Sequence, residues 1–176
     1  SNFSRYIVFG AFFPCVTAGP LVMHREIMEQ LADRKDSAFD MRRLVTGLTM
    51  FGMGLFKKVA LADSIAPYAN TVFDGVAAGG SADLMTAWIG AACYGLQLYF
   101  DFSGYSDMAL GAAFIFGIRL PLNFDSPFKA SNISDFWRGW HMTMTRFFTS
   151  YLYSIMAMNG MRAAMMKKAG RFEKFL

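Results

Sequence analysis

Long apolar runs separated by short polar groups make up most of the chain. No charged residue occurs from Tyr6 to Met23. A helical run of that length crosses most of a bilayer core of roughly 30 Å, at about 1.5 Å per residue. Four further apolar runs cover residues 44–66, 84–100, 108–118 and the stretch after Ser134. The pattern predicts an all-α, multi-pass transmembrane helical protein with about five membrane segments.

Prolines and polar residues divide these runs. Two prolines interrupt the first run, which predicts either a broken helix that dips into the membrane or a simple proline kink, with neither favoured. Residues 24–43 are the most polar and predict a loop with a short amphipathic helix, whose apolar side carries Ile27 and Leu31. Residues 67–83 contain several glycines and no Lys or Arg, and they predict a flexible loop.

Lys57 and Lys58 interrupt an otherwise apolar run. Their side chains either snorkel to a membrane interface or face a polar interior, and snorkelling is the commoner arrangement. His24 stands at the edge of the first run. A histidine there is most often an interfacial or capping residue.

The sequence DFSGYSD at residues 101–107 allows two geometries. If it is helical, Asp101 and Tyr105 share one face while Asp107 points to roughly the opposite one, so a single site holds only one of the two aspartates. If it forms a turn at Gly104, both aspartates converge.

Composition supports a membrane class, because 55% of the 176 residues are hydrophobic and only 17% are charged. The net charge of +4 needs no nucleic-acid partner, since basic residues of membrane proteins gather in cytoplasmic loops. Alternation of crossings with that rule predicts residues 24–43 and the basic tail in the cytoplasm, and the connections 74–83 and 119–133 outside. Cys15 and Cys93 lack ligand spacing, so neither a disulfide nor a metal site is predicted.

His141 is the best single candidate for proton transfer, because imidazole titrates near neutral pH. Ser134 is the predicted N-cap of its helix, which would place Trp137, His141 and Met144 along one side. A core histidine hydrogen-bonded to Asp101 or Asp135 is the alternative, and on the residues alone it is the more frequent case.

Five collinear segments, from Phe12 to Tyr153, resemble the membrane-bound O-acyltransferase family in its alginate O-acetyltransferase-like branch. The segments are FFPCVTAGPLVMHREIMEQL, GLFKKVALAD, DFSGYSDMALG, FGIRLPLNFDSPF and SDFWRGWHMTMTRFFTSYLY. The resemblance implies that residues 1–176 are the central part of a single membrane domain, truncated at both ends. It also implies a multi-pass protein of the bacterial inner membrane.

The function implied by the resemblance is transfer of an acyl group, in particular acetyl, to hydroxyls of an exported polysaccharide such as alginate. The acyl donor would be acyl-CoA or an acyl-carrier thioester, bound as a substrate, and no bound cofactor is expected. Expected partners are membrane lipid, the donor, and the exported polysaccharide or a periplasmic acyl-relay protein.

The resemblance places His141 on the upstream member of two signature histidines and implies a second one beyond Leu176. We therefore expect His141 to be catalytic and the 176-residue chain to be inactive alone. The expected active-site shell consists of Trp137, Arg138, Trp140, Asp101, Tyr105 and Asp107. The alternative function is a transporter or channel module in which Asp101, Asp107 and Lys57 line a proton or ion pathway.

Overall fold

The structure is a computed structural model that describes residues 3–16, 18–32 and 40–161, and all regular secondary structure in these ranges is helical. The predicted cytoplasmic tail lies outside the described residues. In chain order the elements are α1 (Phe3–Gly10), α2 (Phe13–Val16), α3 (His24–Ala32), α4 (Met41–Phe56), the π-helix η1 (Lys57–Ala62), α5 (Asp63–Ala77), α6 (Leu84–Ile115), the 3-10 helix η2 (Pro127–Lys129), α7 (Ile133–Gly139), α8 (Met142–Phe148) and the π-helix η3 (Thr149–Tyr153). The predicted all-α class is confirmed.

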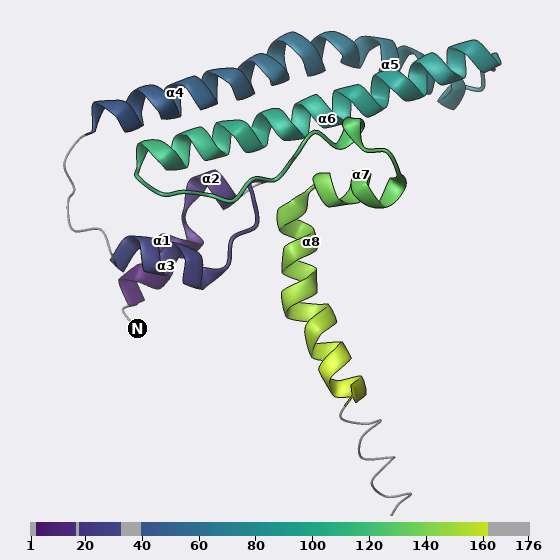
Figure 1. Ribbon diagram of the computed structural model, residues 1–176. Coiled ribbons are helices and arrows are strands. Elements are labelled where there is room, and N and C mark those ends of the chain that lie inside the picture. Colours follow the sequence, from purple (N-terminus) through teal and green to yellow (C-terminus); the bar gives the residue numbers. More distant parts are fainter. Residues whose placement is uncertain (1–2, 17, 33–39, 162–176) are drawn as a thin grey trace, which may run out of the picture.

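The longest helices form an antiparallel pair (Figure 1). α4, η1 and α5 are continuous from Met41 to Ala77, and within the described residues this is the one helix long and apolar enough to cross a membrane. The loop predicted over residues 67–83 is wrong for 67–77, because α5 continues through Pro67. A proline removes one backbone hydrogen bond, and α5 nevertheless stays helical through Pro67 where it packs along α6.

α6 runs for 32 residues and begins at the N-cap Asp83, whose side chain accepts a hydrogen bond from the Thr86 amide at 3.0 Å. It contains both predicted segments, 84–100 and 108–118, together with the polar run between them. The run 101–107 is therefore helical and does not connect two crossings. The separate segment predicted from Met108 is wrong, because the polar run finds its partners on the neighbouring helix.

Glycines bring the two long helices into backbone contact. A Cβ atom added at Gly54 would lie 2.5 Å from the carbonyl oxygen of Gly104, and one added at Gly111 would lie 2.5 Å from that of Gly47. These pairs are seven residues apart on both helices. No side chain fits at either crossing, so the small residues set the distance between the helices.

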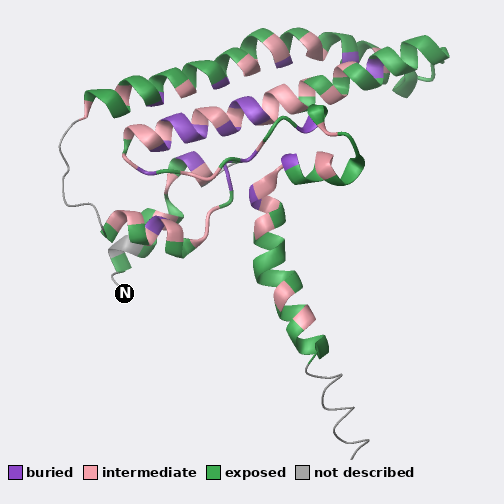
Figure 2. Ribbon diagram, viewed as in Figure 1, coloured by how far each residue is buried: buried purple, intermediate pink, exposed green. Residues whose placement is uncertain are grey.

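The N-terminal segments pack on the end of this pair. α1 ends at Gly10 and α2 has only four residues, so the first apolar run is a broken helix rather than a kinked one. α3 is the predicted amphipathic helix, and its fully buried Ile27 forms a core with Ala113 and Ile118. Figure 2 shows that buried residues concentrate on the inner side of α6, whereas the outer surfaces of the long helices are largely exposed.

The connection after α6 returns to α3. The side-chain amide of Gln30 donates to the carbonyl oxygen of Arg119 at 3.0 Å and accepts from the Arg119 amide at 2.7 Å. Residues 116–122 therefore lie at the end of the helix pair where α4 begins, and residues 78–83 lie at the other end. The predicted alternation placed 24–43 and 119–133 on opposite sides because it counted 101–107 as a connection.

The predicted helix after Ser134 is divided in two. Its N-cap is Asn132, which accepts from the Asp135 amide at 2.9 Å, and α7 ends at Gly139. α8 begins after His141 and continues through η3 to residue 161, pointing away from the long pair (Figure 1). The break means that Trp137, His141 and Met144 do not share one side of a helix.

Candidate functional site

The charged residues of the helix pair bind one another. Lys57 Nζ lies 2.6 Å from Asp107 Oδ2, and Lys58 Nζ lies 2.8 Å from Asp101 Oδ1 and 2.7 Å from Asp63 Oδ1. The Lys57 and Asp107 side chains are only 28% and 31% exposed. The lysines thus face polar partners, and snorkelling, the commoner arrangement, is not the one found.

The two aspartates of α6 pair with different lysines, as predicted for a helical run that presents only one of them to a given site. Lys57 and Lys58 begin the π-helix η1, and their long side chains reach α6 on either side of the contact with Gly104. Tyr105 lines a pocket of about 170 Å³ with Phe13, Phe51 and Met108. The three shell residues predicted on α6 therefore contact α2, α4 and η1.

His141 occupies a strained turn between α7 and α8. Its φ of 45° lies in the left-handed region, which is uncommon for a residue with a side chain. Two backbone hydrogen bonds hold the turn: the Asp125 amide donates to the Gly139 carbonyl at 3.0 Å, and the Met142 amide donates to the Asn123 carbonyl at 2.9 Å. A Cβ atom at Gly139 would meet the Asp125 carbonyl oxygen at 2.7 Å, so glycine is required there.

The His141 imidazole is half-buried against Phe102, edge to face, with ring centroids 4.7 Å apart. Within the described part of the chain it has no hydrogen-bond partner. Asp101 pairs with Lys58, and Asp135 pairs with Arg138 and Asn132, so neither satisfies the imidazole as a core histidine would require.

Burial lowers the pKa of His141, because the imidazolium loses hydration. The residue lies in the connection between α7 and α8, outside the long helices. The neutral ring is favoured near neutral pH, and its nitrogen lone pair is free of any described hydrogen-bond donor. This is the state that a general base requires.

Aromatic rings pack beside His141. Trp140 stacks on Phe136 at 5.5 Å and contacts Phe124 and Tyr99. Phe124 also contacts Phe102, the ring against which His141 packs, so Trp140 and His141 belong to the same aromatic cluster. The other two shell residues predicted on α7 are on its outer side: Trp137 is 55% exposed and Arg138 pairs with Asp135.

A buried polar cluster, which the sequence reasoning missed, lies directly after His141. Asn123, Ser106 and Thr143 are each 2% exposed. Asn123 Nδ2 donates to Ser106 Oγ at 3.1 Å, and Thr143 Oγ1 donates to Asn123 Oδ1 at 2.9 Å. The available signal was an asparagine within an otherwise apolar PLNF sequence, since buried amides are nearly always hydrogen-bonded.

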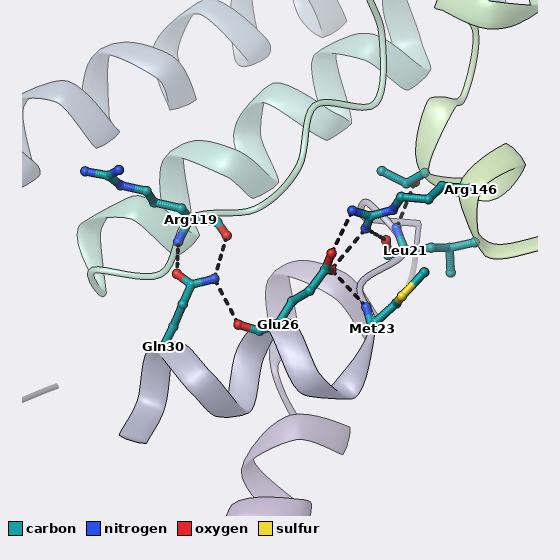
Figure 3. A network of polar contacts seen from close by, with 7 residues as sticks. Leu21, Met23, Glu26, Gln30, Arg119 and Arg146 are labelled. Carbon is teal, nitrogen blue, oxygen red and sulfur yellow. Dashed lines mark hydrogen bonds and ion pairs between the residues drawn. The ribbon is translucent and has the colours of Figure 1, made fainter. Parts of the chain in front are cut away.

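A second polar link joins α3 to α8 (Figure 3). Arg146 binds Glu26 with two nitrogens, at 2.7 and 3.0 Å, and also donates to the Leu21 carbonyl at 3.3 Å. Glu26 accepts from the Met23 amide at 3.1 Å as well. The first turns of α8 are thus anchored to the N-terminal segments. His24, which begins α3, packs its ring against Phe9 and Tyr6 and takes no part in this link.

No group of three or more His, Cys, Asp or Glu side chains in the described ranges is placed to hold a metal ion.

Comparison with known proteins identifies the family. The sequence model of the membrane-bound O-acyltransferase family matches residues 1–168. The chain belongs to this family. It is 48% identical to a peptidoglycan O-acetyltransferase of Helicobacter pylori, over 87% of the chain and 28% of that protein. It is 39% identical to a probable alginate O-acetylase AlgI of Azotobacter vinelandii, over 86% of the chain and 29% of that protein.

A less similar relative has a different activity in its name. A teichoic acid D-alanyltransferase of Bacillus subtilis is 32% identical over 85% of the chain and 37% of its own length. The chain thus spans about three tenths of the first two relatives and somewhat more of the third. The family resemblance predicted from the motifs is confirmed, and with it the membrane-bound class.

Proposed function

We propose that the protein containing this chain transfers an acyl group, in particular acetyl, to a hydroxyl of an exported polysaccharide. The proposal rests on the His141 imidazole, which is half-buried, has no described hydrogen-bond partner and is held in a left-handed turn. The chain's membership of the acyltransferase family supplies the type of reaction. A polar ring kept in a strained turn without a bonding partner is typical of a reacting group.

In the proposed reaction, neutral His141 accepts the proton of the acceptor hydroxyl as its oxygen attacks the donor carbonyl. The new bond joins the acceptor oxygen to the acyl carbon, and the carbon–sulfur bond of the donor thioester breaks. The proton then passes to the leaving thiolate. The thioester, from acyl-CoA or an acyl carrier, is a substrate, and no bound cofactor is invoked. Trp140 and Phe102 would exclude water from the imidazole.

The acceptor is proposed from the relatives. Their names cite peptidoglycan, alginate and teichoic acid, which are all polymers outside the cytoplasmic membrane. Identity is higher to the peptidoglycan enzyme than to the alginate one, at 48% against 39%. We therefore propose acetylation of an exported glycan, with cell-wall glycan ahead of alginate. The exported polymer or a periplasmic acyl-relay protein, together with membrane lipid, completes the proposed partners.

We further propose a multi-pass protein of the bacterial inner membrane in which both helices of the long pair cross. α6 is less apolar than the helix Met41–Ala77, and we propose that it crosses with Asp101 and Asp107 held in ion pairs with Lys58 and Lys57.

Arg42 and Arg43 at the start of α4 and Arg119 after α6 lie at one end of the pair, while residues 78–83 at the other end carry no Lys or Arg. The rule for basic residues puts the first end in the cytoplasm. An impermeant thiol reagent should label Ser81→Cys but not Gln30→Cys in intact spheroplasts, with native cysteines removed. The reverse labelling would contradict the orientation.

The transporter alternative is not favoured. It needs Asp101, Asp107 and Lys57 to line a pathway, whereas Asp107 pairs with Lys57 and Asp101 with Lys58 across the helix contact. Paired charges of this kind stabilise the register of two helices.

The direct test is His141→Ala in the full-length protein, with acetyl esters on the exported glycan as the measurement. We expect a loss of about 10²-fold or more, since general acid–base catalysis contributes 10²–10⁴. His24→Ala is the matched control, because its ring packs on Phe9 and Tyr6 away from the turn. Acetylation at the wild-type level with equal expression of His141→Ala would refute the assignment.

The 176-residue chain alone is proposed to be inactive. Expressed in cells deleted for the full-length protein, it should insert in the membrane without restoring acetyl esters. Restoration to near the full-length level would contradict the requirement for a second histidine outside this chain.

A further inference from the structure

We propose that Asn123 is the positioning residue of the candidate site, holding His141 in its reactive geometry from the connection that follows α6. This inference deepens the proposed function and rests on it for the activity measurement. Asn123 is 2% exposed, so it meets no substrate and acts through His141.

Asn123 binds the first two residues of α8 on both its backbone and its side chain. Its carbonyl oxygen accepts from the Met142 amide at 2.9 Å, and its Oδ1 accepts from Thr143 Oγ1 at 2.9 Å and from the Thr143 amide at 3.4 Å. The residue held by these bonds is the one directly preceding them, His141. The N-terminus of α8 is thereby capped by a residue distant in sequence, since His141 forms no side-chain cap.

The same amide fixes this turn to α6. Asn123 Nδ2 donates to Ser106 Oγ at 3.1 Å, and Ser106 is one helical turn from Phe102, the ring on which the imidazole packs. The Asn123 side chain therefore fixes the position of His141 relative to Phe102. An amide can do this because it accepts at one end and donates at the other, which an apolar residue of similar size cannot.

The strain at His141 makes such a device necessary. A residue with a side chain persists in the left-handed region only where its surroundings over-determine it. The Asp125 to Gly139 bond fixes the turn on one side of His141, and the Asn123 bonds fix it on the other. Without Asn123 the turn loses one of its two supports and the imidazole is free to reorient.

Thr143 supplies the discriminating variants. Its hydroxyl donates to Asn123 Oδ1 and accepts from the Leu21 amide at 2.9 Å. Thr143→Ser keeps both hydrogen bonds, whereas Thr143→Val keeps the shape and loses both. A role that required only packing would rank the two variants in the opposite order.

The experiment uses the full-length protein purified in detergent and expressed in cells. Diethyl pyrocarbonate is the probe of the imidazole, and peptide mass spectrometry compares carbethoxylation of His141 with that of His24 in the same molecule. Acetyl esters on the exported glycan, per amount of folded protein, give the activity. Asn132→Ala is the matched control, because Asn132 is an exposed cap at the opposite end of α7 from the His141 turn.

For Asn123→Ala we expect the rate of His141 carbethoxylation relative to His24 to rise several-fold and acetylation to fall by about tenfold or more, as for a misplaced catalytic group. Thr143→Val should show the same pair of changes, and Thr143→Ser should retain wild-type behaviour. Unchanged His141 reactivity in both Asn123→Ala and Thr143→Val would overturn the proposal. Equal effects from Asn132→Ala, or a loss with Thr143→Ser as large as with Thr143→Val, would also overturn it.

Failure of the proposed function gives a different result. If His141→Ala left acetylation intact while Asn123→Ala still raised His141 carbethoxylation, the acyl-transfer role of His141 would fall and the positioning of its ring by Asn123 would stand. If Asn123→Ala did not fold, the Thr143→Val and Thr143→Ser pair would decide the matter by the same two measurements.

Discussion

The long helix pair and the turn around His141 are held together in different ways. In the pair, glycine backbones meet and the outer faces carry exposed apolar side chains such as Leu48 and Phe56. At the turn, the contacts are hydrogen bonds between atoms that are almost fully buried. Close backbone packing fixes helices over a long distance, whereas directional hydrogen bonds fix one side chain.

The two regions also differ in whether their ionisable side chains have polar partners. Each lysine at the start of η1 has a carboxylate partner on α6. The imidazole of His141 has a ring contact but no described hydrogen bond. The comparison separates lysines and carboxylates whose charges stabilise the fold from an imidazole that has no described hydrogen bond.

The largest effect should come from filling a glycine contact. Gly54→Ala places a Cβ atom 2.5 Å from the Gly104 carbonyl oxygen, so the helices must move apart. Overpacking costs about 1–3 kcal/mol, and more against a rigid backbone. Thermal unfolding in detergent should show a clear loss of stability. Gly52→Ala on the same helix meets nothing within 4 Å and should behave as wild type. Equal stability of the two variants would contradict the glycine contact.

Breaking an interhelical ion pair should have the next largest effect. Lys57→Ala leaves the Asp107 carboxylate without its partner, although the Asp107 side chain is only 31% exposed. We expect a loss of about 1–3 kcal/mol, below the value for fully buried pairs. The exchanged pair, Lys57→Asp with Asp107→Lys, should recover part of the stability. No recovery would indicate that the interaction measured was not the ion pair.

A smaller loss is expected at the link between α3 and α8. Arg146→Ala removes a two-nitrogen contact to Glu26, but these side chains are 37% and 35% exposed. Solvent screening reduces the expected cost to about 1 kcal/mol. Arg25→Ala is the control, since Arg25 pairs with Glu29 within α3 and is 87% exposed, and it should produce no measurable change. A control loss as large as that of Arg146→Ala would contradict the anchoring role.

The smallest effect concerns pH. Burial lowers the pKa of His141 below its ordinary value of 6.5, because the charged ring loses hydration. The neutral ring's contribution to stability is therefore fully present above the unfolded value and is lost as pH falls through the folded one. The pH profile of His141 carbethoxylation should have its midpoint below 6.5. A midpoint above that value would contradict the burial effect.

The helical class, the amphipathic α3 and the family could all be predicted from the amino-acid sequence. Apolar periodicity is local, and the motifs are contiguous, so both can be read without contacts. His141 was a candidate for the same reason: its residue type and its neighbours are visible in one segment.

The continuation of α6 through residues 101–107 depends on tertiary contacts, because its aspartates pair with Lys57 and Lys58, which lie far earlier in the chain. The break before α8 also depends on tertiary contacts, since the left-handed turn at His141 is held by hydrogen bonds from the connection containing Asn123. Local propensity favoured one continuous helix there. Hydrogen bonds between distant segments outweighed it, and such bonds cannot be inferred from the spacing of residues along a chain.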